Sequence, residues 1–303
     1  MPKMLIHVSE EEGFASRVRT SLSLYNCARK IGAEFRIHQK HPCRLSRFLD
    51  CGSYDWRLSD ESYEEYLKSW NRKPLTLYVS DKDLNDEKIA SFENDYVFAS
   101  MYESRDVWNG AKFRQMHSEL FKLTPWMQDI TERQLKMIGG DFISCSFRFS
   151  NNLGGILHDI DYHIKPMDSS GQESIIKQAM SHLEFVHGLH PDSRIFVSSD
   201  SLAWYERIKG LPYVHVADCS QFSMSDGEKW MLKSVSEFYI LGESRRIYQI
   251  LDKSFNVYTV GHEETQHVSQ FPLLAGLRKD VPVTQLFYEG DKHWERAWEG
   301  LSI

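Results

Sequence analysis

The chain has 303 residues, 41% of them hydrophobic, and a formal net charge of −7 at pH 7. This length and apolar content are enough for a large buried core, which we expect to be divided between two domains. A mildly acidic chain counts against a protein that binds or modifies nucleic acid, because such proteins gather Lys and Arg residues against the phosphates.

The N-terminal residues and the cysteines indicate a cytoplasmic protein. Residues 1–13 contain a short apolar run followed by acidic residues, without the apolar core or the small-residue cleavage site of a signal peptide. No apolar segment reaches the roughly 20 residues that a membrane-spanning helix requires. The five cysteines are odd in number and scattered, which is typical of reduced thiols.

The first half of the chain opens with a strand, a helix and a second strand. Residues 4–8 (MLIHV) form an apolar run that predicts a buried strand. Apolar residues at helical spacing predict a helix over residues 14–31, and Gly32 follows as the residue that ends it. Residues 33–38 (AEFRIH) are expected to form the next strand, which gives the order of a parallel βαβ unit.

The rest of this half contains two more expected strands, at residues 75–79 and 96–100. Residues 111–122 and 127–137 are expected to form helices that Pro125 separates. The glycine pair at 139–140 marks the predicted boundary, so that residues 1–139 form the first domain.

The same order of strands and helices restarts after this glycine pair, which predicts an α/β protein built from two Rossmann-like domains that face a cleft. We expect the second domain to cover residues 140–285. Residues 286–303 are expected to form a C-terminal helix, which could pack back on the first domain. The expected elements of the second domain are strands at 141–149, 193–199, 213–217 and 245–250, and helices at 170–187, 201–208 and 226–242.

The loop after the first strand holds the first candidate residues, because ligands of open α/β sheets bind at the carboxyl ends of strands. Gly13 allows the backbone to turn tightly or to approach a ligand, and the amides of the following helix can hold an anion. Glu12 could then act as a general base. Alternatively, Glu10, Glu11 and Glu12 complement the helix dipole, and composition alone favours this simpler explanation.

Three further strand ends carry polar side chains. Arg148 offers a bidentate fork for a phosphate, or it is a surface arginine on an edge strand. Ser199 and Asp200 follow an apolar strand, where Asp200 could accept a hydrogen bond from a base or a ribose, or cap the next helix. Ser254 could donate its hydroxyl and its backbone N–H to a phosphate.

Together these stretches resemble the fucosyltransferase superfamily of GT-B fold, which includes bacterial nodulation α1,6-, eukaryotic core α1,6-, α1,2- and protein O-fucosyltransferases. The loop GFASR (13–17) is similar to the family's G-x-G-N-R-like loop, and SFRFSN (146–151) keeps the arginine of its H-x-R-x-x-D motif. The pair Ser199-Asp200, the helix pattern from Glu237 to Ser244, and Lys253-Ser254-Phe255 follow in the family's order over most of the chain.

The opening segment is most similar to the O-fucosyltransferase that acts on thrombospondin-type repeats, which carries E-G-F-N-L-R-R at this place. Glu12, Gly13, Phe14 and Arg17 match that motif. The family's glutamate is the catalytic base, so the resemblance implies this role for Glu12. It places Gly13, Phe14 and Arg17 at the donor, with Arg17 as a second basic group near the leaving phosphate.

For the second domain, the resemblance implies that Arg148 binds the β-phosphate of GDP-fucose and stabilises the leaving diphosphate. It further implies that Ser199 and Asp200 lie at the nucleoside, and that Ser254 and Phe255 line the phosphate and sugar pocket. Ser146 and Asn151 stand where the family has a histidine and an aspartate. These departures affect the identity of the donor sugar more than the phosphate contact.

The resemblance therefore predicts an inverting, metal-independent glycosyltransferase that moves fucose, or a related sugar, from a GDP-sugar to a hydroxyl of a glycan or a protein. Such an enzyme is expected to need no cofactor beyond the nucleotide-sugar donor. We expect it to bind no nucleic acid and to have no transmembrane segment. One alternative is a metal-dependent GT-A-like transferase that uses Asp159 and Asp161, which form a D-x-D triplet. The other is a non-catalytic protein of the same fold that binds a nucleotide or a glycan.

A group of histidines offers a further metal pattern, which we interpret differently. His182 and His187 are five residues apart and do not share a helical face, and the stretch is not H-E-x-x-H. His182, His187 and His190 are therefore expected to complement the C-terminal end of a helix. No G-x-S-x-G signature of nucleophilic catalysis is present in the chain.

Overall fold

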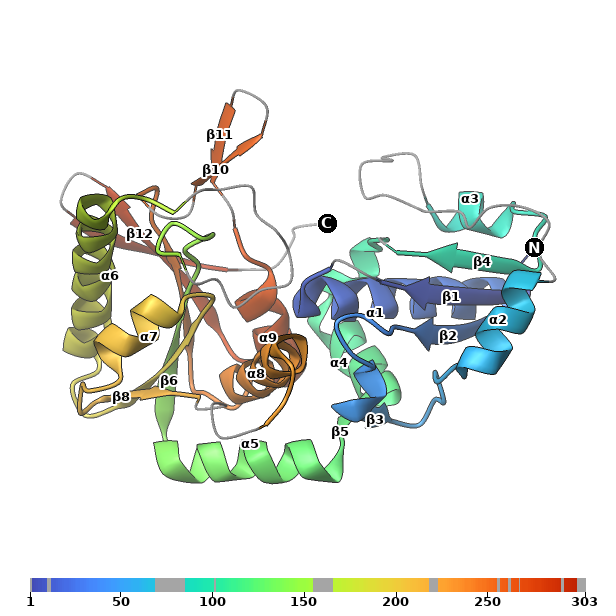
Figure 1. Ribbon diagram of the computed structural model, residues 1–303, viewed down its shortest axis with the longest axis horizontal. Helices are drawn as coiled ribbons and strands as arrows, with labels where there is room; N and C mark the ends of the chain where they lie inside the picture. Colours follow the sequence, from blue (N-terminus) through green and yellow to red (C-terminus); the bar gives the residue numbers. More distant parts are fainter. Residues whose placement is uncertain are drawn as a thin grey trace. The chain divides into compact units, whose positions relative to one another are not determined.

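The computed structural model describes residues 2–9, 12–68, 85–100, 102–154, 166–217, 223–254, 257–260, 263–266, 268–289 and 292–298. The chain divides into two compact units (Figure 1). Unit 1 consists of Met1–Gln128 with Gly300–Ile303, and unit 2 consists of Asp129–Glu299. Among the described helices, none is both long and apolar enough to cross a lipid bilayer.

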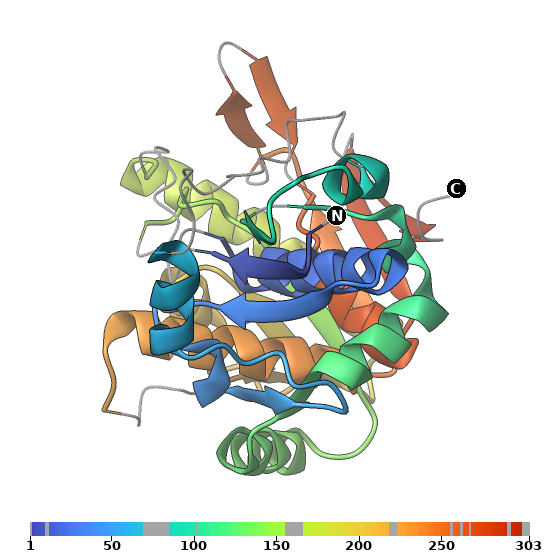
Figure 2. The same cartoon turned by 90° about the vertical axis from the view of Figure 1, so that its right-hand side faces the viewer.

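Unit 1 is built on a parallel sheet with the strand order β2-β1-β4. Its strands are β1 (Met4–Val8), β2 (Glu34–His38) and β4 (Tyr96–Ala99), and Figure 2 shows β1 and β2 running in the same direction. Helix α1 (Phe14–Ile31) connects β1 to β2 and ends at Gly32, whose φ of 70° is left-handed. The predicted strand–helix–strand opening is therefore confirmed.

The structure adds short elements to unit 1 that were not predicted. The expected helix at 111–122 ends early, because Phe121–Leu123 is extended and pairs antiparallel with Leu49–Cys51. The expected strand at 75–79 lies outside the described residues. The remaining elements of unit 1 are η1 (Leu45–Arg47), β3 (Leu49–Cys51), α2 (Asp60–Lys68), α3 (Asp86–Ala90), η2 (Arg105–Trp108), α4 (Gly110–Leu120) and β5 (Phe121–Leu123).

The division between the two units falls inside a helix. Helix α5 (Pro125–Ile138) begins at a proline, whose fixed φ and missing N–H suit the first helical position. The contacts of its first residues belong to unit 1, and those from Asp129 onward belong to unit 2. The division therefore precedes the predicted boundary at Gly139 and Gly140, which follow the helix directly.

Unit 2 contains a six-stranded sheet with the order β13-β12-β9-β6-β7-β8, in which only the pairing of β13 is antiparallel. The chain enters at β6, proceeds to β7 and β8 on one side, and then places β9 and β12 on the other. This reversal beside β6 is a topological switch point, where open α/β sheets bind ligands. The strands are β6 (Phe142–Phe147), β7 (Arg194–Ser199), β8 (Val214–Val216), β9 (Ile247–Leu251), β12 (Val283–Glu289) and β13 (Lys292–Ala297).

The helices of unit 2 follow the predicted order, and one helix and a small hairpin are additional. The expected helices at 170–187, 201–208 and 226–242 are present, whereas α9 and the hairpin were not predicted. The elements are α6 (Ser169–Leu189), α7 (Leu202–Ile208), α8 (Asp226–Leu241), α9 (Phe271–Lys279), β10 (Val257–Val260) and β11 (Glu263–Gln266).

The predicted C-terminal helix over 286–303 is wrong for the residues that the structure describes there. Residues 286–289 belong to β12, which pairs with β13, so that Leu286 lies opposite Glu295. Trp294 and Trp298 are spaced four residues apart as in a helix, but the backbone N–H of Trp298 bonds to the main-chain oxygen of Val283 at 2.9 Å. The exposed edge of β12 offers a row of backbone partners, and this pairing overrides the local helical spacing.

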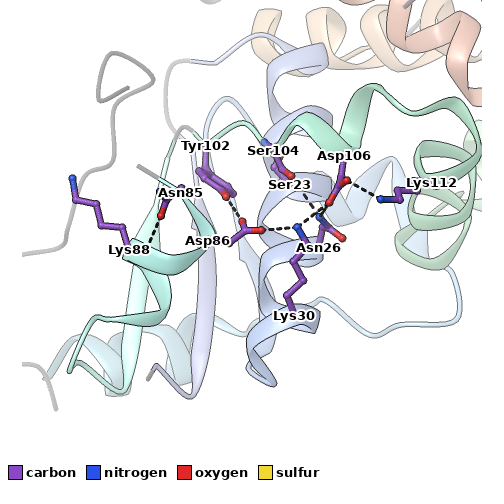
Figure 3. A network of polar contacts seen from close by, with 10 residues as sticks. All are labelled: Ser23, Asn26, Lys30, Asn85, Asp86, Lys88, Tyr102, Ser104, Asp106 and Lys112. Carbon is purple, nitrogen blue, oxygen red and sulfur yellow. Dashed lines mark hydrogen bonds and ion pairs between the residues drawn. The ribbon is translucent and has the colours of Figure 1, made fainter. Parts of the chain in front are cut away.

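The outer face of α1 in unit 1 carries a network of polar contacts (Figure 3). The carboxylate of Asp106 accepts hydrogen bonds from Lys112 at 2.7 Å and from Asn26 at 2.9 Å, and it pairs with Lys30 at 2.8 Å. Lys30 also pairs with Asp86 at 2.6 Å. These contacts join α1 to α3, η2 and α4, and the hydrogen bonds from Lys112, Lys30 and Asn26 hold the pKa of Asp106 well below its usual range.

We predict that Asp106→Asn lowers the free energy of unfolding by about 1 kcal/mol at pH 7, because Lys112 and Lys30 each lose one carboxylate partner, while Lys30 keeps Asp86. A carboxylate with a depressed folded pKa stabilises the protein above its unfolded pKa of about 3.9, and this contribution is lost as the pH falls through the lower folded value. The difference from wild type should therefore narrow below about pH 4 in urea titrations.

The matched control is Asp129→Asn, which removes an exposed i,i+4 pair with Arg133. We expect it to change the free energy of unfolding by less than about 0.5 kcal/mol. Equal effects of the two substitutions would show that the Asp106 network does not hold α1 in place.

Candidate functional site

A buried polar cluster, here called the β1 cluster, lies at the carboxyl end of β1 in unit 1. It consists of His7 on β1, Glu12 in the following loop, Arg17 and Ser21 on α1, and Gln39 directly after β2. All five side chains are buried. Parallel strands end at the same edge of a sheet, which is why residues distant in sequence meet there.

Glu12 is the least satisfied member of the β1 cluster. It is 6% exposed, and neither oxygen of its carboxylate has a hydrogen-bond partner among the described residues. Its nearest ionisable partner is His7, with 3.8 Å between Glu12 Oε2 and His7 Nε2. An unpaired buried carboxylate is costly, so its position demands an explanation other than stability.

The Glu12 carboxylate makes no hydrogen bond to the N-terminal amides of α1, and its electrostatic interaction with the helix dipole stays a prediction. The N-cap residue Gly13 has no side chain with which to cap α1. Gly13 has φ of −63° and ψ of 154°, an extended conformation that any residue can adopt. Its predicted role in a tight turn is therefore not required, while a close approach to a ligand remains a prediction.

Arg17 and Phe14 lie in the interior of unit 1. The Arg17 guanidinium is 1% exposed and donates to the main-chain oxygens of Glu12 and His41, both at 2.7 Å. It thereby ties the loop after β1 to the loop after β2. Phe14 is 2% exposed and belongs to the core. Their predicted contacts with a donor remain predictions, because in this structure both side chains face the protein.

Arg148 follows β6 directly, at the switch point of the sheet in unit 2. The predicted alternation is confirmed, since Phe147 and Phe149 are buried against Trp204 while the Arg148 side chain remains 15% exposed. Arg148 Nε pairs with Asp200 Oδ2 at 3.3 Å. The strand thus places a guanidinium, held by a carboxylate, where the fold binds ligands.

Asp200 organises the loop after β6. Its carboxylate oxygens accept hydrogen bonds from the backbone N–H groups of Phe149 at 2.8 Å and Ser150 at 2.9 Å. Ser150 and the next residue, Asn151, have positive φ values of 49° and 72°. A left-handed conformation costs a non-glycine residue roughly 1–2 kcal/mol, so the carboxylate offsets strain in this loop.

One predicted role of Asp200 was to cap the following helix, and this prediction is wrong. Ser201 caps α7 instead, because its side chain accepts from the backbone N–H of Trp204 at 3.3 Å. The predicted contact of Asp200 with a nucleoside remains a prediction, and in this structure both of its oxygens serve the neighbouring loop.

A buried network beneath Ser199 holds the end of β7. Lys233 Nζ donates to the main-chain oxygen of Ser199 at 2.5 Å and pairs with Glu237 at 2.8 Å. The Tyr205 hydroxyl accepts from the Ser199 N–H and donates to Glu237, both at 2.6 Å. Burial and the Glu237 carboxylate raise the pKa of Tyr205 well above its ordinary value, which keeps this hydroxyl a donor.

Sequence reasoning assigned no role to Lys233 or Tyr205, and noted Glu237 only as part of a family pattern. Lys233 and Glu237 are spaced i,i+4 on a helix whose other residues near them are mostly apolar. That spacing of opposite charges inside an apolar pattern is the signal that could have identified them.

Ser254 lies beyond the end of β9, the strand next to β6. Its backbone N–H and its hydroxyl both donate to Asp252 Oδ1, at 2.8 and 2.7 Å. Asp252 Oδ2 bonds to His182 Nε2 at 2.7 Å, and His182 Nδ1 lies 3.1 Å from His293 Nε2. Burial opposes ionisation of Asp252, yet the hydrogen bonds from His182 and Ser254 keep its pKa below the ordinary value.

These contacts change the interpretation of His182 and limit that of Ser254. His182 is fully buried inside α6, seven residues before Leu189 ends the helix, so its predicted role at the helix terminus is wrong. Ser254 directs both donors to Asp252 in this structure, so its predicted phosphate contact requires a local rearrangement.

Phe255, Asp159 and Asp161 lie outside the described residues. Within the described ranges, no three His, Cys, Asp or Glu side chains converge as metal ligands would.

Comparisons with known proteins relate the chain to solved structures alone. No protein-family model and no curated protein sequence matches it. The fucosyltransferase NodZ from Bradyrhizobium matches with a TM-score of 0.60 and 14% identity, over 98% of this chain and 99% of that chain. NodZ α-1,6-fucosyltransferase soaked with GDP-fucose gives a TM-score of 0.58 at 13% identity, over 98% of this chain and 99% of that chain.

A mutant of Arabidopsis thaliana FUT1 in complex with GDP also matches, with a TM-score of 0.58 and 13% identity, over 96% of this chain and 72% of that chain. The chain therefore has the GT-B fold of these fucosyltransferases, and the predicted fold class is confirmed. At these identities the likeness establishes the fold, which is not the GT-A fold of the first alternative.

We predict that Asp200→Ala lowers the free energy of unfolding of unit 2 by about 3 kcal/mol, because two buried backbone N–H groups and a guanidinium lose their acceptor. The control is Asp141→Ala, just before β6, which removes a pair with Arg245 from a side chain that is 68% exposed. It should change the value by less than about 0.5 kcal/mol in urea unfolding. Equal losses would show that Asp200 does not stabilise the loop.

Proposed function

We propose that the protein is an inverting glycosyltransferase that transfers fucose, or a related sugar, from a GDP-sugar to a hydroxyl group of a glycan or a protein. The observation that carries the proposal is the position of Arg148, at the carboxyl end of β6 and beside the switch point of a GT-B fold. Two of the matching structures are NodZ soaked with GDP-fucose and a FUT1 mutant in complex with GDP, which supports a guanine nucleotide as the donor.

Arg148 is suited to stabilise the departing diphosphate. Negative charge grows on the β-phosphate as the bond to the sugar breaks, and a cation that is already in place lowers the barrier. Asp200 contacts the guanidinium through Nε at 3.3 Å, which holds the cation at the end of β6. Because Asp200 also fixes the loop after β6, little reorganisation is needed when the donor binds.

Glu12 is suited to accept the proton of the acceptor hydroxyl. The hydroxyl oxygen forms a bond to the anomeric carbon, its proton passes to the Glu12 carboxylate, and the bonding electrons to the β-phosphate oxygen leave with GDP. A single displacement of this kind inverts the anomeric carbon. The carboxylate is buried, and neither of its oxygens has a hydrogen-bond partner among the described residues, so both keep lone pairs for the incoming proton.

A second candidate function is binding of a nucleotide or a glycan without catalysis. It is favoured by Ser146, which stands where the resembling family has a histidine, and by Ser254, whose donors are used by Asp252. GDP release from GDP-fucose separates the two functions, because a binding protein forms a complex with the donor and leaves it intact.

A thermal-unfolding screen with GDP, UDP, ADP and CMP tests the proposal. We predict that GDP alone raises the unfolding temperature, since a ligand at 100 times its Kd stabilises the folded state by about 2.7 kcal/mol. Arg148→Ala should abolish the GDP effect, because the β-phosphate loses its cation. The control is Arg194→Ala, which removes an exposed arginine from the opposite end of the neighbouring strand β7 and should keep the effect.

Similar stabilisation by all four nucleotides would contradict a GDP-sugar donor. An unchanged GDP effect in Arg148→Ala would contradict the assignment of the phosphate site to the carboxyl end of β6.

A further inference from the structure

Behind Glu12, the β1 cluster contains a second ionisable side chain that sequence reasoning did not select. His7 lies on β1, is fully buried, and contacts polar groups through both ring nitrogens. Nδ1 lies 2.7 Å from Ser21 Oγ, and Nε2 faces Glu12 Oε2 at 3.8 Å. A histidine in the middle of a central strand that bonds to a serine on one side and faces an unpaired carboxylate on the other has a defined orientation.

The neighbours of His7 favour one of its two neutral tautomers. In a neutral imidazole one nitrogen donates and the other accepts, whereas the Ser21 hydroxyl can do either. A proton on Nδ1 would leave the Nε2 lone pair facing the Glu12 carboxylate, which is repulsive. A proton on Nε2 lets Ser21 donate to Nδ1 and directs an N–H toward Glu12. The second arrangement is favourable at both nitrogens.

The other groups around His7 are consistent with this assignment. The Nε2 amide of Gln39, after β2, lies 3.3 Å from Nδ1 and 3.4 Å from Nε2, and it carries no charge. On the other neighbouring strand, β4, the residue opposite His7 is Ala99. The charged group contributed by α1 is Arg17, whose described donors reach the main-chain oxygens of Glu12 and His41. Among the described residues, His7 is thus the ionisable side chain that pairs with the Glu12 carboxylate.

We propose that His7 is a positioning residue for the catalytic base, and this proposal rests on the proposed function of Glu12. Its Nε2–H orients the Glu12 carboxylate, which accepts the proton of the acceptor hydroxyl. Ser21 fixes the tautomer from the far side of the ring. The order serine–histidine–carboxylate occurs in hydrolases, but here Ser21 is fully buried and the carboxylate is the reacting group.

The kcat and KM of GDP formation from GDP-fucose test this role. In His7→Gln kcat should fall about tenfold, because the Glu12 carboxylate is no longer held in one orientation for proton transfer. KM for GDP-fucose and the GDP effect on unfolding temperature should remain close to wild type, because donor binding does not depend on the orientation of the base. Ser21→Ala should lower kcat by less, because the tautomer is then held less firmly.

The matched control is His117→Gln, which replaces a buried histidine on α4 of the same unit. It should leave kcat close to wild type, so that a general loss of packing in unit 1 is distinguished from the loss of His7. An unchanged kcat in His7→Gln, or an equal fall in kcat in His117→Gln, would overturn the proposal.

Nitrogen-15 NMR of the imidazole groups tests the pairing of His7 with Glu12 without any enzymatic turnover, because it reports which ring nitrogen carries the proton. The signal that disappears in His7→Gln should show the Nε2–H tautomer in the wild-type protein at pH 7. An Nδ1–H tautomer would overturn the proposal whatever the activity. An Nε2–H tautomer in a wild-type protein that forms no GDP would instead overturn the proposed function, and with it the role of His7 in catalysis, while the pairing would stand.

Discussion

The carboxylate of Asp200 is the contact on which the rest of the proposed donor site depends. It accepts from two consecutive backbone N–H groups after β6, pairs with Arg148, and offsets the left-handed conformations of Ser150 and Asn151. The network of Lys233, Tyr205 and Glu237 fixes the preceding residue, Ser199. The end of β7 is therefore held by several buried contacts. Asp200, which follows it, then holds the neighbouring loop that carries Arg148, the candidate for binding a phosphate.

Unit 1 likewise holds a charged side chain at the end of a parallel strand. At the end of β1 this side chain is the anion Glu12, whereas in unit 2 it is the cation Arg148. There the strand and the helix bury a carboxylate, and His7 and Arg17 determine where the loop that carries it lies. In each unit a polar group that the core tolerates poorly is held at the carboxyl end of a parallel strand. Strain and incomplete hydrogen bonding of this kind are typical of functional sites.

The sequence predicted those parts of the fold that are encoded locally. Helix α1 has the predicted bounds, because the apolar spacing from Phe14 and the left-handed Gly32 are features of the segment itself. The strand β13 was mistaken for helix, because it forms through pairing with β12 rather than through its own pattern. The short strands β3 and β5 were missed for the same reason, since their partners lie about 70 residues apart in the chain.

The site could be predicted only in part from the sequence. The rule that ligands lie after strands selected Glu12, Arg148 and Asp200, but it assigned Asp200 to a ligand rather than to the loop after β6. His7 was read as one more residue of a buried strand, although a histidine in the run MLIHV was a signal of a polar neighbour. The roles of both residues depend on contacts between segments far apart in sequence.

We propose that Glu12 is the base of a sugar transfer that Arg148 and the surrounding backbone support without a metal ion. The most direct test is the rate of GDP formation from GDP-fucose, with glycan and peptide acceptors and excess EDTA, for wild type and Glu12→Gln. With Glu12 as the base, EDTA should leave the wild-type rate undiminished, and the rate of Glu12→Gln should be at least about 100-fold lower. Equal rates for the two proteins, or a wild-type rate that EDTA abolishes and Mn²⁺ restores, would contradict it.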